Sequence, residues 1–450
     1  MSKFENNLSE GSVVKQLILF SLPVLISNLI QSLYSAVDML VVGQFSGPEA
    51  MSGVNIGGQV SFLVTNMVFG LSVGATVLIG QYKGANDREN MKRTISTLFV
   101  SLLVAAVLIT VVTIGLQTPL LKLIQTPKES FAEAKSYFFI SMLGTIFIFG
   151  YNALSAVMRG LGDSKNPLIF VAVACFTNII LDVILVAIFK MGAAGAAIAT
   201  VFSQALSMIL CIIYLKKNNF VFDFSIKSFK TASIKHLKLI LKIGIPTSIQ
   251  NVAISTSFLF LTALVNSIGV MASAAVGAVG KLNGFAILPG VAMSTSVSAM
   301  VAQNIGAGKY DRASKTMFVG MAIATGISVV IFAIVGIFPE KCIGLFGSDP
   351  ELIKCGVEYM KAFKYDYLIA PLCFCFNGLF IGSGKTTFSL INGIMSSILF
   401  RIPASFLLGI TLAMGLNGVG LGAPIASGAS LLFCVLFFLS GKWKFKVIHN

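Results

Sequence analysis

Long apolar stretches alternate with short polar segments along the whole chain. Each stretch is long enough to cross a bilayer as a helix, for which about 20 apolar residues are needed, whereas barrel strands are shorter and alternate polar with apolar positions. Twelve such stretches lie near residues 14–42, 52–80, 94–116, 136–158, 167–189, 193–215, 244–267, 274–301, 316–338, 358–381, 387–409 and 418–440. The pattern predicts an all-α membrane protein with twelve transmembrane helices.

Composition supports this prediction. Of the 450 residues, 56% are hydrophobic and only 11% are charged, compared with roughly 25% charged residues in a soluble domain. The first residues, 1–16, are polar and lack the pattern of a cleavable signal peptide, so we expect the first helix to direct membrane insertion.

The net charge of +15 is unevenly distributed between the two sides of the predicted bundle. With the N-terminus inside, about 22 Lys and Arg residues fall on the cytoplasmic side and about 8 outside, which follows the positive-inside rule. We therefore expect a multi-pass protein of the cell membrane with both termini in the cytoplasm. The basic excess suits anionic lipid headgroups, and no nucleic-acid partner is implied.

The second half of the chain repeats the first after 222–223 residues. The aligned landmarks are Pro23 with Pro246, Asn28 with Asn251, Gln81 with Gln303, Tyr137 with Tyr359, the loop 159–165 with 381–387, and Gly192 with Gly415. Because each copy holds an even number of helices, both copies insert in the same orientation and are expected to be related by a pseudo-twofold axis along the membrane normal. The sequence thus predicts two six-helix bundles.

We expect an N-lobe of residues 1–215 (helices 1–6) and a C-lobe of residues 244–450 (helices 7–12). Between them, residues 216–243 form a cytoplasmic linker with a basic amphipathic pattern, KSFKTASIKHLKLILK. Such a helix lies in the membrane interface. A solvated linker helix is an equally acceptable interpretation.

Two carboxylates interrupt the apolar helices of the first copy. Asp182 lies four residues after Asn178, so both share one helical face, and Asp38 shares a face with Gln31 and Tyr34. A carboxylate at mid-bilayer depth costs about 3 kcal/mol even on lenient insertion scales. We therefore interpret Asp38 and Asp182 as functional.

Further polar side chains of the first copy add amide and hydroxyl oxygens to this set. They are Asn152 and Tyr137 in the fourth predicted helix and Thr200 in the sixth. Hard oxygen donors suit Na⁺, and a carboxylate removed from water can also carry a proton. A cation-exchanging site is predicted, with Na⁺ possible at Asp38, Asn178, Asp182 and Thr200. The alternative is a structural hydrogen-bonded cluster that ties helices together.

The second copy carries cations instead. Lys281 and Arg401 lie within its predicted helices, and Asp366 lies in the outer part of the tenth. A buried cation needs a partner, so we favour a structural ion pair of Asp366 with Lys281 or Arg401 over substrate binding.

Enzyme chemistry and cofactors are not expected. The seven cysteines have no metal-ligand spacing, although Cys342 and Cys355 share an external loop where they could pair. The two histidines, His236 and His449, fall in polar cytoplasmic segments. The segment 378–387 looks like a phosphate-binding loop, but its glycine spacing is wrong and no strand precedes it.

The motifs at the helix ends resemble those of a known family. The paired endings GQYKGAN and AQNIGAG, the loop RGLGDSKNP and the turn MGAAGAA resemble the multidrug and toxic compound extrusion (MATE) family over essentially the whole chain. The resemblance implies export of organic cations and drugs, driven by inward movement of Na⁺ or H⁺. It also implies that one set of residues forms the cation-coupling site of the N-lobe: Asp38, Asn152, Asn178, Asp182 and Thr200.

The same resemblance suggests that Gln31 and Tyr137 line the substrate cavity, and we expect Tyr34, which shares a helical face with Gln31, to line it too. Some branches of the family also have an acidic pair on the seventh and tenth helices, but here the seventh has no acidic residue. We therefore assign coupling to the N-lobe.

The predicted function is a monomeric secondary active multidrug exporter that needs no cofactor besides its coupling ion. A flippase for a lipid-linked precursor is the alternative, because Lys281 and Arg401 could meet a pyrophosphate. A membrane scaffold without transport activity is a further alternative.

Overall fold

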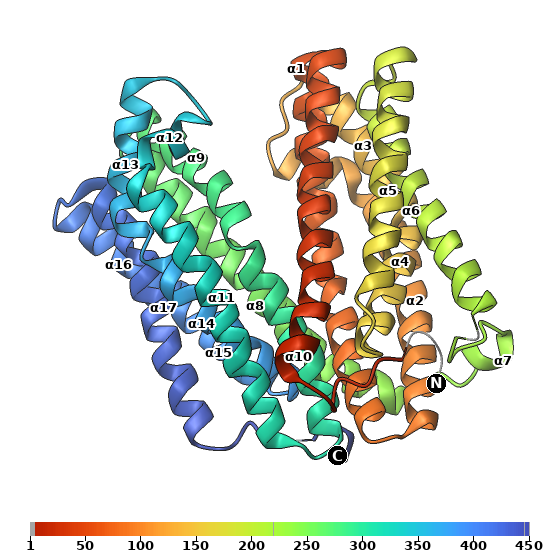
Figure 1. Ribbon diagram of the computed structural model, residues 1–450. Helices are drawn as coiled ribbons and strands as arrows, with labels where there is room; N and C mark the ends of the chain where they lie inside the picture. The colour runs from red at the N-terminus through yellow and green to blue at the C-terminus, as the bar shows by residue number, and fades with distance from the viewer. Residues whose placement is uncertain (1–4, 219, 445, 450) are drawn as a thin grey trace. The chain divides into compact units, whose positions relative to one another are not determined.

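The computed structural model describes residues 5–218, 220–444 and 446–449, and these residues form helices and turns with no strand. The helices assemble into two compact units (Figure 1). Unit 1 comprises Met1–Asn7 and Ile26–Ile245, and unit 2 comprises Leu8–Leu25 and Pro246–Asn450. Compared with the expected lobes, the linker joins unit 1 and the start of the first helix joins unit 2. The lobe boundaries at residues 215 and 244 stay a prediction.

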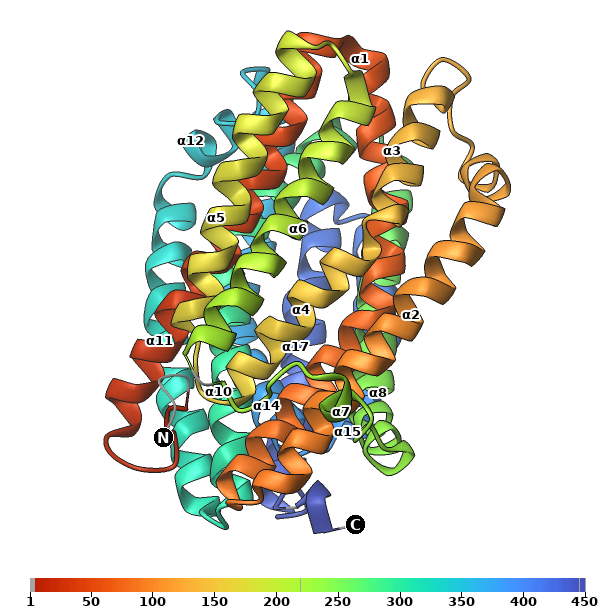
Figure 2. The same cartoon turned by 90° about the vertical axis from the view of Figure 1, so that its right-hand side faces the viewer.

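Unit 1 contains the helices up to the middle of the chain. They are α1 (Val13–Gly84, of which residues 26–84 belong here), α2 (Arg88–Leu123), α3 (Phe131–Leu143), α4 (Thr145–Gly160), α5 (Lys165–Asp182), the π-helical η1 (Val183–Ile188), α6 (Gly192–Lys217), α7 (Ile226–Phe229) and the first part of α8 (Ile234–Asn266). Figure 2 shows α5 and α6 running side by side.

Unit 2 contains the remaining helices. They are α9 (Val270–Ala286), α10 (Leu288–Gly306), α11 (Tyr310–Ile337), α12 (Pro339–Gly344), α13 (Pro350–Phe363), α14 (Asp366–Gly382), α15 (Thr386–Ile394), η2 (Met395–Arg401), α16 (Ile402–Phe406), η3 (Leu407–Thr411), α17 (Gly415–Leu439) and η4 (Val447–His449). Here η2 and η3 are π-helical and η4 is a 3₁₀ turn.

The described residues contain nine helices long and apolar enough to cross a membrane, or eleven when each of two bent pairs counts as one span. Helix α1 alone has 72 residues, a length of about 108 Å if straight, far beyond a hydrocarbon core of about 30 Å. The backbone leaves helical geometry at Gly47 (φ 83°), which divides α1 into two spans. The twelve-helix, all-α fold predicted from the sequence is confirmed.

The backbone also confirms the internal repeat. Residues with positive φ recur 222 or 223 positions apart: Gly47 with Gly269, Asn86 with Gly308, Gly162 with Gly384, Lys190 with Ala413, and Gly192 with Gly415. The same helix pair is bent in each copy, by 50° between α3 and α4 and by 51° between α13 and α14. The π-helices η1 and η3 also occupy equivalent positions. Both copies therefore share their turns, their bend and a local winding defect.

Each unit holds part of the N-terminal segment by hydrogen bonds. In unit 1, the Asn6 side chain donates to the Gly162 carbonyl (3.0 Å) and Lys83 Nζ donates to the Asn6 carbonyl (2.9 Å). In unit 2, the Arg312 guanidinium donates to the carbonyls of Glu10 and Gly11, each at 2.7 Å. These contacts fix residues 5–11 before α1 begins.

Candidate functional site

Asp38 and Asp182 meet inside unit 1, although 144 positions of sequence separate them. Asp38 lies on α1 and Asp182 is the last residue of α5; their exposed fractions are 7% and 0%. The two carboxyl groups lie within hydrogen-bonding reach of each other. Among the described residues, no donor reaches either carboxylate oxygen of Asp182 or Oδ1 of Asp38.

This arrangement suits a bound cation. Two adjacent carboxylates repel each other, and buried charges without donors lose their hydration. A proton shared between the two groups, or a metal cation between them, removes the repulsion and supplies the missing interaction. The pair can therefore exchange one positively charged species for another.

Three polar side chains form a short hydrogen-bond chain in the same unit. The Tyr34 hydroxyl donates to Thr200 Oγ1 at 2.9 Å, and Asn178 Nδ2 donates to the same oxygen at 3.4 Å. Asn178 is fully buried, and its Oδ1 has no donor among the described residues. Thr200 thus joins α1, α5 and α6, and leaves the Asn178 carbonyl oxygen free to face a cation.

Tyr137 on α3 completes the surroundings of the pair. It interacts electrostatically with both Asp38 and Asp182 and is 8% exposed. Gly57 on α1 packs against its ring, because a Cβ there would lie 2.9 Å from Tyr137 Cδ1. Small residues at such a contact let membrane helices approach closely.

Two residues of the predicted set have no hydrogen bond to this cluster among the described residues. The Asn152 side chain donates to the Ile148 carbonyl one turn earlier on α4, at 2.9 Å. Gln31 on α1 is exposed. Neither side chain has a hydrogen bond to Asp38, Asp182 or Thr200 within the described part of the chain. Asn152 and Gln31 are therefore not brought into the site by direct contact.

A π-helix that the sequence pattern does not predict begins directly after Asp182. In η1 the backbone hydrogen bonds span five residues instead of four, a winding defect that is frequent at functional sites. The segment VILVAI is uniformly apolar and carries no signal for π-helical winding. Only the recurrence of the defect at η3 marks it as a feature of the repeat.

The cations of unit 2 have different partners from those predicted. Arg401 donates to the Ser257 hydroxyl at 3.2 Å, and its guanidinium lies 4.7 Å from the centre of the Phe258 ring. Asp366 accepts a hydrogen bond from Ser427. Arg401 and Asp366 interact only at longer range, and Lys281 is exposed. The described residues contain no ion pair among these three within 4.0 Å.

The described residues contain no disulfide and no cluster of metal-binding side chains. All seven cysteines are free, including Cys342 and Cys355. No group of three or more His, Cys, Asp or Glu side chains within the described ranges could hold a metal ion. His236, expected in a polar segment, is 2% exposed on α8, and its ring centre lies 5.9 Å from that of Tyr82.

The fold and the buried polar site together define a multi-pass α-helical membrane transporter built from two copies of one unit. The MatE family profile matches both copies, at residues 23–184 and 246–407. The two matches are displaced by 223 residues, as the internal repeat predicts.

Similar proteins agree with this family. A probable multidrug resistance protein of Bacillus subtilis, YpnP, is 31% identical over 97% of both chains. A second from the same organism, YoeA, is 28% identical over 98% of this chain and 96% of its own. A structure described as the outward-facing conformation of a multidrug resistance MATE family transporter matches with a TM-score of 0.89 and 22% identity, over 97% of this chain and 96% of that chain. The chain belongs to the MATE family of membrane transporters and is not an enzyme.

Proposed function

We propose that the chain is a secondary active exporter that moves organic cations and drugs out of the cell in exchange for inward Na⁺ or H⁺. The observation that supports this most is the buried contact between Asp38 and Asp182, whose oxygens lack donors among the described residues. The similar Bacillus subtilis proteins are described as probable multidrug resistance proteins, which agrees with the drug-export part of this proposal. We place the protein in the cell membrane, as a monomer with both termini in the cytoplasm.

The mechanism is competition for one pair of carboxylates. A lipophilic cation binds at Asp38 and Asp182. Na⁺ or H⁺ arriving from outside then neutralises the two carboxylates and displaces the lipophilic cation. Antiport follows when the drug-bound and ion-bound proteins favour different conformations, because a ligand shifts an equilibrium only by its differential affinity for the two states. Asn178 and Thr200 supply the amide and hydroxyl oxygens that a Na⁺ ion needs beside the carboxylates.

Equilibrium binding of tetraphenylphosphonium to the purified protein tests this proposal. We expect Na⁺ at constant pH, or acid without Na⁺, to weaken binding, and we expect Asp182→Asn to remove that effect. Glu129→Gln is the matched control, since Glu129 is an exposed acidic residue of the same unit. If the cation binds equally well to Asp182→Asn and remains sensitive to Na⁺ or pH, the carboxylate pair is not the coupling site.

A flippase for a lipid-linked precursor is the second candidate function. The lack of a carboxylate partner for Arg401 among the described residues favours it. The Nε of Arg401 has no partner among the described residues, and no carboxylate lies within 4.0 Å. A guanidinium that has no carboxylate partner can bind a phosphate. Two results together would favour this function over export. The protein would not bind tetraphenylphosphonium, and it would flip a fluorescent pyrophosphate-linked lipid in a reaction that Arg401→Gln abolishes.

A further inference from the structure

A small apolar cavity of unit 1 lies between three helices and the linker. Its volume is about 230 Å³, below the range of roughly 300–1,000 Å³ that is usual for drug-sized ligands. All of its lining residues are apolar: Phe99, Leu102, Leu103, Ile146, Phe149, Gly150, Ala153, Leu154, Met208, Ile212, Phe224 and Phe229. The cavity thus offers no hydrogen-bonding side chain to a polar molecule, and it suits a flexible hydrocarbon chain.

The linker covers one side of this cavity as a docked structure. Phe99 of α2 meets three linker rings, with centroids 5.5 Å from Phe222, 5.8 Å from Phe224 and 6.2 Å from Phe229. Two hydrogen bonds add to the aromatic contacts. The Ser96 hydroxyl donates to the Phe229 carbonyl at 3.0 Å, and the Ser233 amide donates to Thr97 Oγ1 at 3.0 Å. Helix α7 therefore lies beside the N-terminal end of α2 (Figure 2).

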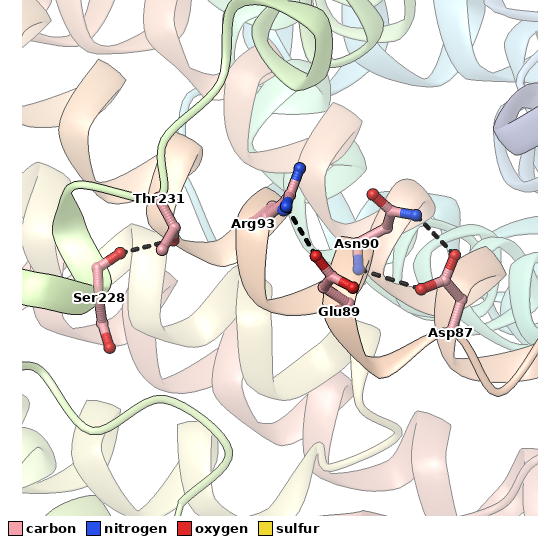
Figure 3. Close-up of polar contacts among 6 residues, drawn as sticks. All are labelled: Asp87, Glu89, Asn90, Arg93, Ser228 and Thr231. Atoms are coloured by element: carbon pink, nitrogen blue, oxygen red, sulfur yellow. Dashed lines mark hydrogen bonds and ion pairs between the residues drawn. The ribbon is translucent and has the colours of Figure 1, made fainter.

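The nearby acidic groups are already engaged, as Figure 3 shows for the first turn of α2. Glu89 pairs with Arg93 at 2.6 Å, and Asp87 accepts from the Asn90 side chain at 2.7 Å. On the linker, Asp223 accepts hydrogen bonds from Ser225 and Ser228, which lower its pKa to about 2 and keep it ionised. Among the described residues, none of these carboxylates forms an ion pair with a linker lysine.

The linker exposes cations and apolar side chains together. Lys227 and Lys230 are exposed, on either side of the cavity residue Phe229, and the described residues place no acid within 4.0 Å of them. Ile226 and Ile234 are 76% and 73% exposed. Lysines beside exposed apolar residues are typical of segments that lie at an anionic membrane surface.

We propose that this cavity is a binding site for an anionic phospholipid. One acyl chain enters between α2, α4 and α6 beneath Phe224 and Phe229, and the headgroup phosphate meets Lys227 and Lys230. Two of the lining residues reach the protein surface and mark the mouth of the cavity: Leu103 is 51% exposed and Ile146 is 39% exposed. The lipid ties the linker to α2, α4 and α6, and its binding does not depend on which substrate the transporter exports.

Native mass spectrometry of the full-length protein in detergent, titrated with phosphatidylglycerol or phosphatidylcholine, tests this site. We expect tighter binding of phosphatidylglycerol. Leu103→Trp closes the mouth of the cavity and should remove most of the bound lipid, whereas Val107→Trp, one turn further on α2 with 53% exposure and outside the lining, should not. Circular dichroism and elution volume confirm that both variants are folded.

The headgroup contact is tested separately by charge. Lys227→Gln combined with Lys230→Gln should lower the preference for phosphatidylglycerol on the order of tenfold or more, since each basic residue near an anionic surface contributes to binding. Lys122→Gln with Lys128→Gln, two exposed lysines of the same unit, should leave the preference unchanged. Equal binding of both lipids to the unaltered protein, or unaltered lipid binding by Leu103→Trp, would overturn the proposal. So would displacement of the lipid by tetraphenylphosphonium, which would make the cavity part of a drug path.

Discussion

Replacing Asp182 with asparagine should stabilise the protein while it abolishes coupling. The amide has the shape of the carboxylate but not its charge, so it removes the repulsion from Asp38. Two unit charges about 4 Å apart repel by roughly 4 kcal/mol at an effective dielectric constant of about 20. With Asp182 fully buried and without donors among the described residues, little else offsets this repulsion when both groups are ionised.

Thermal unfolding in detergent at pH 8 measures the effect. In choline chloride, Asp182→Asn should unfold at a higher temperature than the unaltered protein. Adding Na⁺ should raise the unfolding temperature of the unaltered protein, because a ligand that binds only the folded state stabilises it by mass action, and should not affect the variant. At acidic pH the two unfolding temperatures should move closer together, since a proton then sits between the two carboxylates of the unaltered protein.

The same experiment separates a cation site from a structural cluster. If the carboxylates only tie helices together through hydrogen bonds, Na⁺ should not raise the unfolding temperature of the unaltered protein. Asp182→Asn, whose amide can still hydrogen-bond to Asp38, would then unfold at no higher a temperature than the unaltered protein in choline chloride, and that result would refute the reasoning. Asp38→Asn should behave like Asp182→Asn, and Glu129→Gln should match the unaltered protein.

Three further predictions concern other contacts. Thr200→Val should lower the free energy of unfolding by about 1–3 kcal/mol, because Tyr34 and Asn178 lose their acceptor; a double-mutant cycle with Tyr34→Phe in chemical denaturation should show coupling, and strict additivity would contradict the contact. Arg312→Gln should speed backbone hydrogen exchange of residues 8–12, measured by mass spectrometry, since carbonyl acceptors there lose their donors. Lys315→Gln is the control, and equal exchange rates in Arg312→Gln and the unaltered protein would show that Arg312 does not hold this segment. Asp223→Asn should speed exchange of the Ser225 amide, which donates to Asp223 Oδ1, at neutral pH. The unaltered protein should keep this amide protected from pH 8 to pH 5, because a carboxyl whose folded pKa is about 2 stays ionised there; loss of protection near pH 5 would disprove this.

Much of the architecture follows from local patterns in the sequence. The apolar periodicity predicts the helices, and the recurrence of Pro23 as Pro246 and of Gly192 as Gly415 predicts the repeat that the backbone angles and both family matches confirm. The shared face of Asn178 and Asp182 follows from helical spacing alone. These properties depend on residues close in the chain, or on similarity between the two halves.

Tertiary packing decided which of these faces meet. Spacing along α1 does not tell whether Asp38 contacts Asp182 or another helix, because that depends on the rotation and crossing of α1 and α5. Packing left Asn152 bonded to its own helix and gave Arg401 the Ser257 hydroxyl and the Phe258 ring in place of a carboxylate. It also placed a π-helix after Asp182, in a segment whose apolar residues do not indicate it. The helices, the repeat and the candidate polar residues follow from local sequence patterns, whereas the site depends on contacts between distant helices, which only the folded chain defines.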